Sequence, residues 1–190
     1  KEIAAGRKVG ILDLTKGELG TRGTPELRLE EATAAAKILG LSSRDNVELA
    51  DGFFQYNQDS IVAIVRYIRK YRPNIVLSNA VSDRHPDHGR ASKLISDACF
   101  YSGLRRIETT LEGEEQEAWR PKVIYNYIQD RFIVPDIVVD VTPYIEQKME
   151  AVKAFGSQFF NPVSNEPESP LTHKNFFGYV EGRMMDMGRY

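Results

Sequence analysis

Two of the three histidines in the sequence, His85 and His88, lie three residues apart with Asp87 between them. Imidazole is a common ligand of zinc, and a neighbouring carboxylate can orient the ring. A catalytic zinc ion keeps only three protein ligands, so that a water molecule can take the fourth position. The spacing alone fits two interpretations equally well. The histidines form part of a metal site, or they only cap a helix start through local hydrogen bonds, because so short a motif has many chance matches.

The segments on either side of the histidines predict where they lie in the fold. An almost continuous apolar run covers residues 74–78, and apolar residues recur at helical spacing after Pro86. The run is typical of a strand covered on both faces, and proline suits the first turn of a helix, where its missing N–H costs nothing. The histidines are therefore expected at the C-terminal end of a strand, which is the edge of an α/β sheet where ligands bind.

Along the whole chain, short apolar runs alternate with helical periodicities, which is the pattern of βα units. Strands are predicted over residues 9–14, 46–49, 74–78, 123–127 and 137–141. Helices are predicted over 25–39, around 61–68 before Pro73, from 86, and over 143–155. Residues 108–117 and 161–170 are predicted to be surface loops. The predicted fold class is α/β: a Rossmann-like, mostly parallel sheet with helices on both faces, in a single domain over residues 1–190.

Composition narrows the function classes. The 25 basic and 27 acidic residues give a net charge of -2, so no basic field for nucleic acid exists and no nucleic-acid partner is expected. No apolar run is long enough for a bilayer, so no membrane partner is expected either. Cys99 is the only cysteine, which excludes a disulfide framework and a cysteine-based zinc site and suits a cytoplasmic protein. A metal ion would have to be held by histidine and carboxylate groups.

The segment 83–88, Asp-Arg-His-Pro-Asp-His, resembles the second metal motif of the LmbE/PIG-L zinc-dependent N-deacetylases of amino sugars. Other segments resemble, in the same order, the bacterial subgroup that includes the bacillithiol-pathway deacetylases. These segments are residues 13–15, 23–32, 125–127, 157–159 and 170–172. The resemblance implies one zinc ion per site and hydrolysis of the acetamide of an N-acetylglucosaminyl conjugate. N-acetylglucosaminyl malate is the first substrate that it suggests.

The resemblance also implies roles for individual residues. His88 matches the metal-binding histidine. His85 matches the histidine that stabilises the oxyanion and helps to protonate the departing amine, and Asp87 matches the aspartate that orients it. Arg28 matches a substrate-contacting arginine, whereas its position in the helix also allows a plain ion pair with Glu31 three residues later.

The other metal motif of the family, Ala-His-Pro-Asp-Asp or a near variant, does not occur in the sequence. In the family it ends the first strand and supplies a histidine ligand, an aspartate ligand and the general base. Residues 1–6 resemble the last turn of the helix that follows. The chain is therefore expected to begin downstream of the motif, to lack the first central strand, and to stop short of the family's C-terminus. Expressed alone, it is expected to fold poorly and to be inactive.

Two other functions stay open. The loop with Gly17, Gly20 and Gly23 could belong to a non-catalytic Rossmann-like module that binds a nucleotide or a sugar, although the spacing matches neither the dinucleotide fingerprint nor a P-loop. The residues of 85–88 could also serve a metal-dependent phosphohydrolase. The expected partner of the deacetylase is a small-molecule amino-sugar substrate, and a homo-oligomer is expected.

Overall fold

The computed structural model describes residues 1–190, which form two compact units. Unit 1 contains Lys1–Asp51 and Pro135–Tyr190, and unit 2 contains Gly52–Val134. No helix in either unit is both long enough and apolar enough to cross a membrane. The single domain over residues 1–190 stays a prediction.

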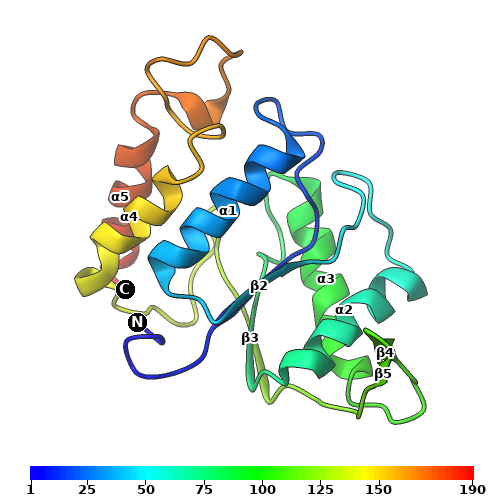
Figure 1. Cartoon of the computed structure of the whole chain (residues 1–190). Coiled ribbons are helices and arrows are strands. Elements are labelled where there is room, and N and C mark those ends of the chain that lie inside the picture. The colour runs from blue at the N-terminus through cyan, green and yellow to red at the C-terminus, as the bar shows by residue number, and fades with distance from the viewer. The chain divides into compact units, whose positions relative to one another are not determined.

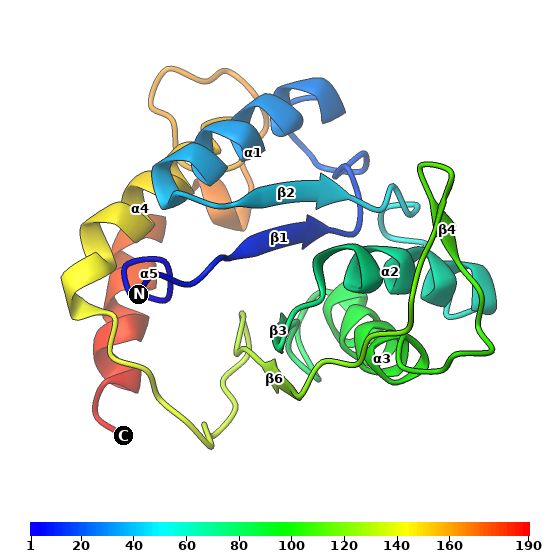
Figure 2. The ribbon, with the colours of Figure 1, turned by 60° about the horizontal axis from the view of Figure 1, so that its bottom comes forward.

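Unit 1 begins with a βαβ arrangement. Strand β1 (Gly10–Asp13) pairs in parallel with β2 (Ser43–Asn46), so that the first residues of the two strands lie opposite each other, as do the last (Figure 2). Helix α1 (Pro25–Leu39) connects them. The pairing is reinforced by Arg44, whose guanidinium binds both carboxylate oxygens of Asp13 at 2.7 and 3.0 Å. Such a two-pronged ion pair has strict geometry and helps to set the register of the two strands.

Helix α1 starts and stops where the sequence predicts. The Thr24 hydroxyl accepts a hydrogen bond from the N–H of Leu27 at 3.2 Å, and Pro25 occupies the first helical position. Gly40 ends the helix in the left-handed conformation, with φ of 72°, a conformation that glycine adopts without steric cost. These signals are local, and the prediction of this helix is confirmed.

The small buried face of α1 allows a close helix contact. Ala32 and Ala35 are buried, and α1 packs against α4 (Ile145–Lys153), which contributes Met149 (Figure 1). Three further elements complete unit 1: the 3-10 turns η1 (Thr142–Tyr144) and η2 (Pro170–Thr172) and helix α5 (Phe176–Met187). Helix α5 was not predicted.

Unit 2 holds most of the buried apolar residues. Helix α2 (Gln58–Tyr71) packs against α3 (Pro86–Tyr101), and β3 (Ile75–Ser78) pairs in parallel with β6 (Val123–Asn126). The core of unit 2 consists of Phe54, Ile61, Ile64, Val65, Ile68, Ala80, Ala91, Leu94, Ala98 and Cys99. The apolar spacing that predicted α2 and α3 is the spacing of these buried residues.

Three local predictions are wrong. The second strand is β2, three residues earlier than the predicted 46–49, because the Asn46 side chain accepts the N–H of Glu48 at 2.7 Å and Glu48 turns to a φ of 61°. Residues 137–141 form no strand, since no other strand lies beside them to pair with their backbone. Residues 108–117 contain a hairpin of β4 (Thr110–Leu111) and β5 (Glu114–Glu115) rather than only a loop.

The strands form three separate two-stranded sheets: β1 with β2, β3 with β6, and β4 with β5. The first parallel pair has the chain order β1-α1-β2, and the second has β3-α3-β6 with the β4–β5 hairpin inserted before β6. The two pairs and their helices confirm a mixed α/β fold. The order of a single Rossmann-like sheet, with a central strand missing, stays a prediction.

Candidate functional site

The histidine pair lies at the N-terminal end of α3, in unit 2. His85 is the residue that precedes the helix, and its ring nitrogen Nδ1 accepts the backbone N–H of Asp87 at 3.2 Å. Pro86 begins the helix, as predicted, and His88 lies in its first turn. The two rings have centroids 5.2 Å apart and are tilted by 32°. The tetrapeptide therefore places both rings at one helix end, shortly after β3.

His88 is held by a buried carboxylate. Its Nδ1 contacts Oδ2 of Asp83, whose side chain has no solvent exposure. The other oxygen of Asp83 accepts the backbone N–H groups of Asp130 at 3.0 Å and Arg131 at 2.8 Å. Asp83 thus joins the loop after β6 to the start of α3. Asp83 belongs to the sequence motif 83–88, but no role is predicted for it from the sequence. The sequence feature that could have indicated this role is a carboxylate a few residues before two histidines.

The surroundings of Asp83 also set its charge. Burial alone favours the neutral acid, but the hydrogen bonds from the N–H of Arg131, the His88 ring, and the N–H groups of Arg84 and Asp130 outweigh it. Together they hold the pKa of the Asp83 carboxyl well below its ordinary value. Asp83 is therefore an ionised acceptor at neutral pH.

Asp87 is buried, and its carboxylate accepts hydrogen bonds from residues other than His85. One of its oxygens accepts the N–H of Gly52 at 2.8 Å, and the other accepts from the Arg90 guanidinium at 2.7 Å. Only the backbone N–H of Asp87 contacts the His85 ring. The expected role of the Asp87 carboxylate in orienting His85 stays a prediction, and in this structure the carboxylate ties the first turn of α3 to Gly52.

For neutral rings, the hydrogen-bond partners of His85 and His88 favour opposite tautomers. Because Nδ1 of His85 accepts a hydrogen bond, the ring proton is assigned to its Nε2, which can then donate. Because Nδ1 of His88 faces a carboxylate, its proton is assigned there, and Nε2 keeps a free lone pair. One ring can therefore donate a hydrogen bond to an oxygen that gains negative charge, and the other can bind a metal ion. Both properties come from side chains of one helix start.

The residues of this chain fit one ligand of a metal site. A histidine ligand whose other ring nitrogen donates to a carboxylate is the usual arrangement in zinc proteins, and His88 with Asp83 has it. The chain holds no group of three or more histidine, cysteine, aspartate or glutamate side chains arranged to hold a metal ion. A complete coordination sphere would need ligands besides His88.

Arg28 lies in unit 1, in the first turn of α1. Its guanidinium donates to the carbonyl oxygen of Arg22 at 2.9 Å, and it makes no ion pair. The alternative pair with Glu31 is not formed, because that carboxylate accepts the N–H and the hydroxyl of Ser157 at 2.6 and 2.7 Å. The charge of Arg28 is therefore not neutralised by any carboxylate.

The glycines at positions 17 and 20 make room for Arg28. A Cβ atom on Gly17 would lie 2.9 Å from Cδ of Arg28, and one on Gly20 would overlap its guanidinium. Gly17 also has a φ of 71°, where a larger residue is strained. These two positions are explained by the side chain that packs over them rather than by a bound phosphate. The site residues are thus divided: His85, Asp87 and His88 lie together in unit 2, and Arg28 lies in unit 1.

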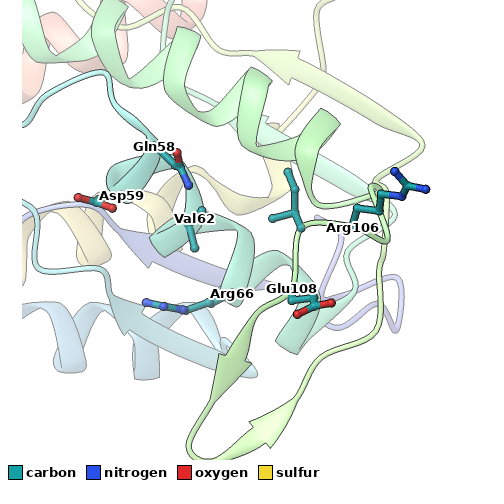
Figure 3. A pocket seen from close by; sticks show the side chains of 7 residues that line it. Gln58, Asp59, Val62, Arg66, Arg106 and Glu108 are labelled. Atoms are coloured by element: carbon teal, nitrogen blue, oxygen red, sulfur yellow. The ribbon is translucent and has the colours of Figure 1, made fainter.

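Unit 2 also has a surface hollow of about 510 Å³ (Figure 3). It is lined by Gln58, Asp59, Val62, Arg66, Arg106, Ile107 and Glu108. Its two basic and two acidic residues balance, and the side chains of Arg66 and Arg106 extend in opposite directions. Its lining residues come from α2 and from the segment that follows α3, and neither His85 nor His88 is among them. The hollow therefore includes neither histidine, and its balanced charges favour neither an anionic nor a cationic ligand.

The fold and the histidine site define an α/β protein with a donor ring and a potential metal-binding ring side by side after a parallel strand. The sequence model of the family described as "PIG-L: GlcNAc-PI de-N-acetylase" matches residues 1–99, which is just over half of the 190 residues. The chain belongs to this family. The predicted membership of the family is thereby confirmed, whereas the bacillithiol subgroup and the zinc motif stay predictions.

Two curated relatives are similar to this chain. A diacetylchitobiose deacetylase of Thermococcus kodakarensis is 30% identical over 155 residues, which cover 79% of this chain and 56% of the relative. A 4-oxalmesaconate hydratase of Pseudomonas putida is 27% identical over 146 residues, covering 75% of this chain and 55% of the relative. The chain thus spans little more than half the length of either relative.

Solved structures share the fold. The conserved protein TT1542 from Thermus thermophilus matches with a TM-score of 0.75 and 37% identity, over 83% of this chain and 70% of that one. An N,N'-diacetylchitobiose deacetylase from Pyrococcus horikoshii matches with a TM-score of 0.74 and 19% identity, over 98% and 68%. A 4-carboxy-2-hydroxymuconate hydratase from Pseudomonas putida matches with a TM-score of 0.62 and 18% identity, over 80% of each chain. The last two show a common fold alone.

Proposed function

We propose that the protein carrying this chain hydrolyses the acetamide of an N-acetylated amino sugar, releasing acetate and a free amine, with one zinc ion per site. The observation that carries the proposal is the pair of rings at the start of α3, where Nδ1 of His85 accepts a backbone N–H and Nδ1 of His88 faces the Asp83 carboxylate. These contacts favour an N–H donor at Nε2 of His85 and a lone pair at Nε2 of His88. The deacetylase relative and the family description support the same reaction class. A homo-oligomer and a cytoplasmic location stay predictions.

In the proposed reaction His88 would hold the metal through Nε2, fixed in direction by Asp83. A bound zinc ion would polarise the acetamide carbonyl and lower the pKa of a bound water toward about 7. His85 would donate a hydrogen bond from Nε2 to the oxygen of the tetrahedral intermediate. The proton that the general base takes from the attacking water would pass to the departing amine as the C–N bond breaks. The family's general base belongs to the Ala-His-Pro-Asp-Asp motif, which does not occur in residues 1–190.

The proposed substrate is an N-acetylglucosaminyl conjugate that carries a carboxylate, and N-acetylglucosaminyl malate is the first compound to test. The support is Arg28, a guanidinium with no carboxylate partner in the structure. A guanidinium binds a carboxylate through two parallel hydrogen bonds, so it favours ligands that carry a carboxylate. The relative that acts on diacetylchitobiose makes an uncharged sugar the natural comparison substrate.

The test uses zinc analysis and acetate release in wild-type protein and in a His88→Ala variant. We expect the substitution to strip the metal and to abolish acetate release, because it removes a metal ligand. His173→Ala is the matched control. It removes the third histidine, which lies in unit 1 and stacks on Tyr179, and it should leave both readouts unchanged. Full zinc content and activity in His88→Ala would overturn the proposal.

Parallel assays separate the other functions. Hydrolysis of phosphate esters without acetate release would favour the phosphohydrolase, and ligand binding without zinc would favour the non-catalytic module. Hydration of 4-oxalmesaconate is tested as well, because one relative is named for that reaction. Acetate release from acetamido sugars, with none of the other reactions, is the expected result.

A further inference from the structure

Asp83 is the most enclosed charged group beside the histidine pair. Its side chain has no solvent exposure, and every contact of its carboxylate is with a donor: the His88 ring, two backbone N–H groups of the loop after β6, and the N–H of Arg84. An ionised carboxylate can only accept hydrogen bonds. A ring nitrogen that faces it at hydrogen-bond distance must therefore carry the proton.

This contact decides what the opposite side of the His88 ring can do. A neutral imidazole has one proton, so a proton on Nδ1 leaves Nε2 with a lone pair. Without the carboxylate, the proton would distribute between the two nitrogens, and the ring would also rotate more freely. Ligand histidines in metal sites are held in this way by an outer carboxylate, and losing it costs metal affinity.

We propose that Asp83 is a positioning residue for metal binding, which locks His88 in the tautomer and orientation that present Nε2 as a ligand. The inference rests on the proposed function, because it assigns Asp83 a part in the same site. Asp83 also links the loop of Asp130 and Arg131 to the start of α3 through the two backbone N–H groups that it accepts.

A merely structural role is the competing explanation. In that case Asp83 would serve only to satisfy the two backbone N–H groups of the loop, and the state of the His88 ring would not depend on it. The two explanations differ for Asp83→Asn. The amide oxygen of asparagine can still accept both N–H groups, but its NH₂ group can only donate to His88. The proton of the ring would then move to Nε2, as happens when a carboxylate behind a catalytic histidine is replaced by an amide.

The experiment measures the ring tautomer and the zinc affinity separately. Nitrogen-15 NMR of the metal-free protein at about pH 8, above the ordinary imidazole pKa of about 6.5, reports which ring nitrogen of His88 is protonated. The His88→Ala variant assigns the signal. We expect Nδ1–H in wild type and Nε2–H in Asp83→Asn, and a loss of zinc affinity of about 10- to 100-fold in competition with a chelator.

Two further variants make the result decisive. Asp130→Asn changes an exposed carboxylate in the same loop and should keep the wild-type tautomer and affinity. Asp83→Glu keeps an acceptor-only carboxylate and should also keep the Nδ1–H tautomer, which tests the proposal even if Asp83→Asn does not fold. An unchanged tautomer in Asp83→Asn, or an unchanged zinc affinity, overturns the positioning role. If His88→Ala binds zinc normally, the proposed metal site fails instead, while the tautomer measurement still decides what Asp83 does.

Discussion

The charge of Arg28 is the feature of unit 1 with the clearest chemical consequence. A cation in the first turn of α1 opposes the helix dipole, at a cost of some tenths of a kcal/mol. Its guanidinium keeps only the hydrogen bond to the Arg22 carbonyl, and two glycines leave room for it. A residue placed at such a cost, with its ion-pairing capacity unused, is suited to hold an anionic group of a ligand.

We predict that Arg28→Lys lowers kcat/KM for N-acetylglucosaminyl malate by about 10- to 100-fold, because a lysine cannot form two parallel hydrogen bonds to a carboxylate. The effect should be much smaller for diacetylchitobiose, which has no carboxylate. Steady-state assays of acetate release measure both. Lys16→Ala is the control, since Lys16 is an exposed cation already paired with Glu48 at 2.8 Å. An equal loss on both substrates would contradict carboxylate recognition by Arg28.

The elements of unit 2 depend on a second arginine, which has a structural role. Arg69 of α2 is 4% exposed and donates to the carbonyl oxygens of Ser102 at 3.0 Å, Leu104 at 2.9 Å and Ile107 at 2.6 Å. It also donates to the Thr109 hydroxyl at 2.8 Å. These carbonyls follow the end of α3, where helical backbone groups lose their partners. Arg69 therefore closes the C-terminal end of α3.

We predict that Arg69→Met lowers the free energy of unfolding by at least about 3 kcal/mol, because several buried carbonyl groups lose their donors together. Urea denaturation followed by circular dichroism measures the change. Arg66→Met is the matched control one turn earlier on the same helix. Arg66 is exposed, and its substitution should change stability by no more than about 0.5 kcal/mol. Equal effects of the two substitutions would rule out the capping role of Arg69.

Helices were predicted more accurately than strands, because the residues that define a helix lie within it or next to it. Helix α1 is defined by a capping threonine, a first-turn proline and a terminal glycine, all within or next to the helix. Strands carry no such signals, because their hydrogen bonds go to another segment. Residues 137–141 are apolar enough for a strand but have no partner strand, and β2 is polar yet pairs with β1.

For the molecule as a whole, three aspartates with lowered pKa values make the stability of the fold sensitive to acid. Burial opposes ionisation of Asp97, but hydrogen bonds from Lys93, at 2.5 Å, and from Tyr56 outweigh it and lower the pKa of Asp97. Hydrogen bonds from Thr142 lower the pKa of Asp140. The pKa of Asp83 is lowered as well. Lowered pKa values in the folded state mean that the unfolded chain binds more protons in acid.

We therefore predict that the unfolding free energy is nearly constant from about pH 7 to pH 5 and falls as the pH drops below about 4, the ordinary pKa of an unfolded aspartate. The stability contributed by these groups is fully present above that value and is lost as the pH falls through the folded pKa values. Denaturation at a series of pH values measures it. A double variant, Asp97→Asn with Asp140→Asn, should be less stable at neutral pH and should lose less in acid. A slope unchanged in the double variant would assign the effect to other groups.

The sequence by itself determined helices α1 to α4 but not α5, the parallel βα character, and the position of His85 and His88 at a helix start after a strand. Those features depend on neighbours within a few residues, so the spacing of residue types is enough to find them. Only the tertiary structure decided which hydrogen bonds the site residues make. Glu31 binds Ser157 rather than Arg28, and Asp83 accepts a hydrogen bond from the loop at Asp130. In both cases the partner is distant in the sequence, so no local pattern indicates the contact. Hydrogen bonds between such distant groups form only when packing brings the groups together. In this chain they leave Arg28 without a carboxylate partner and hold Asp83, the partner of His88, against the loop at Asp130.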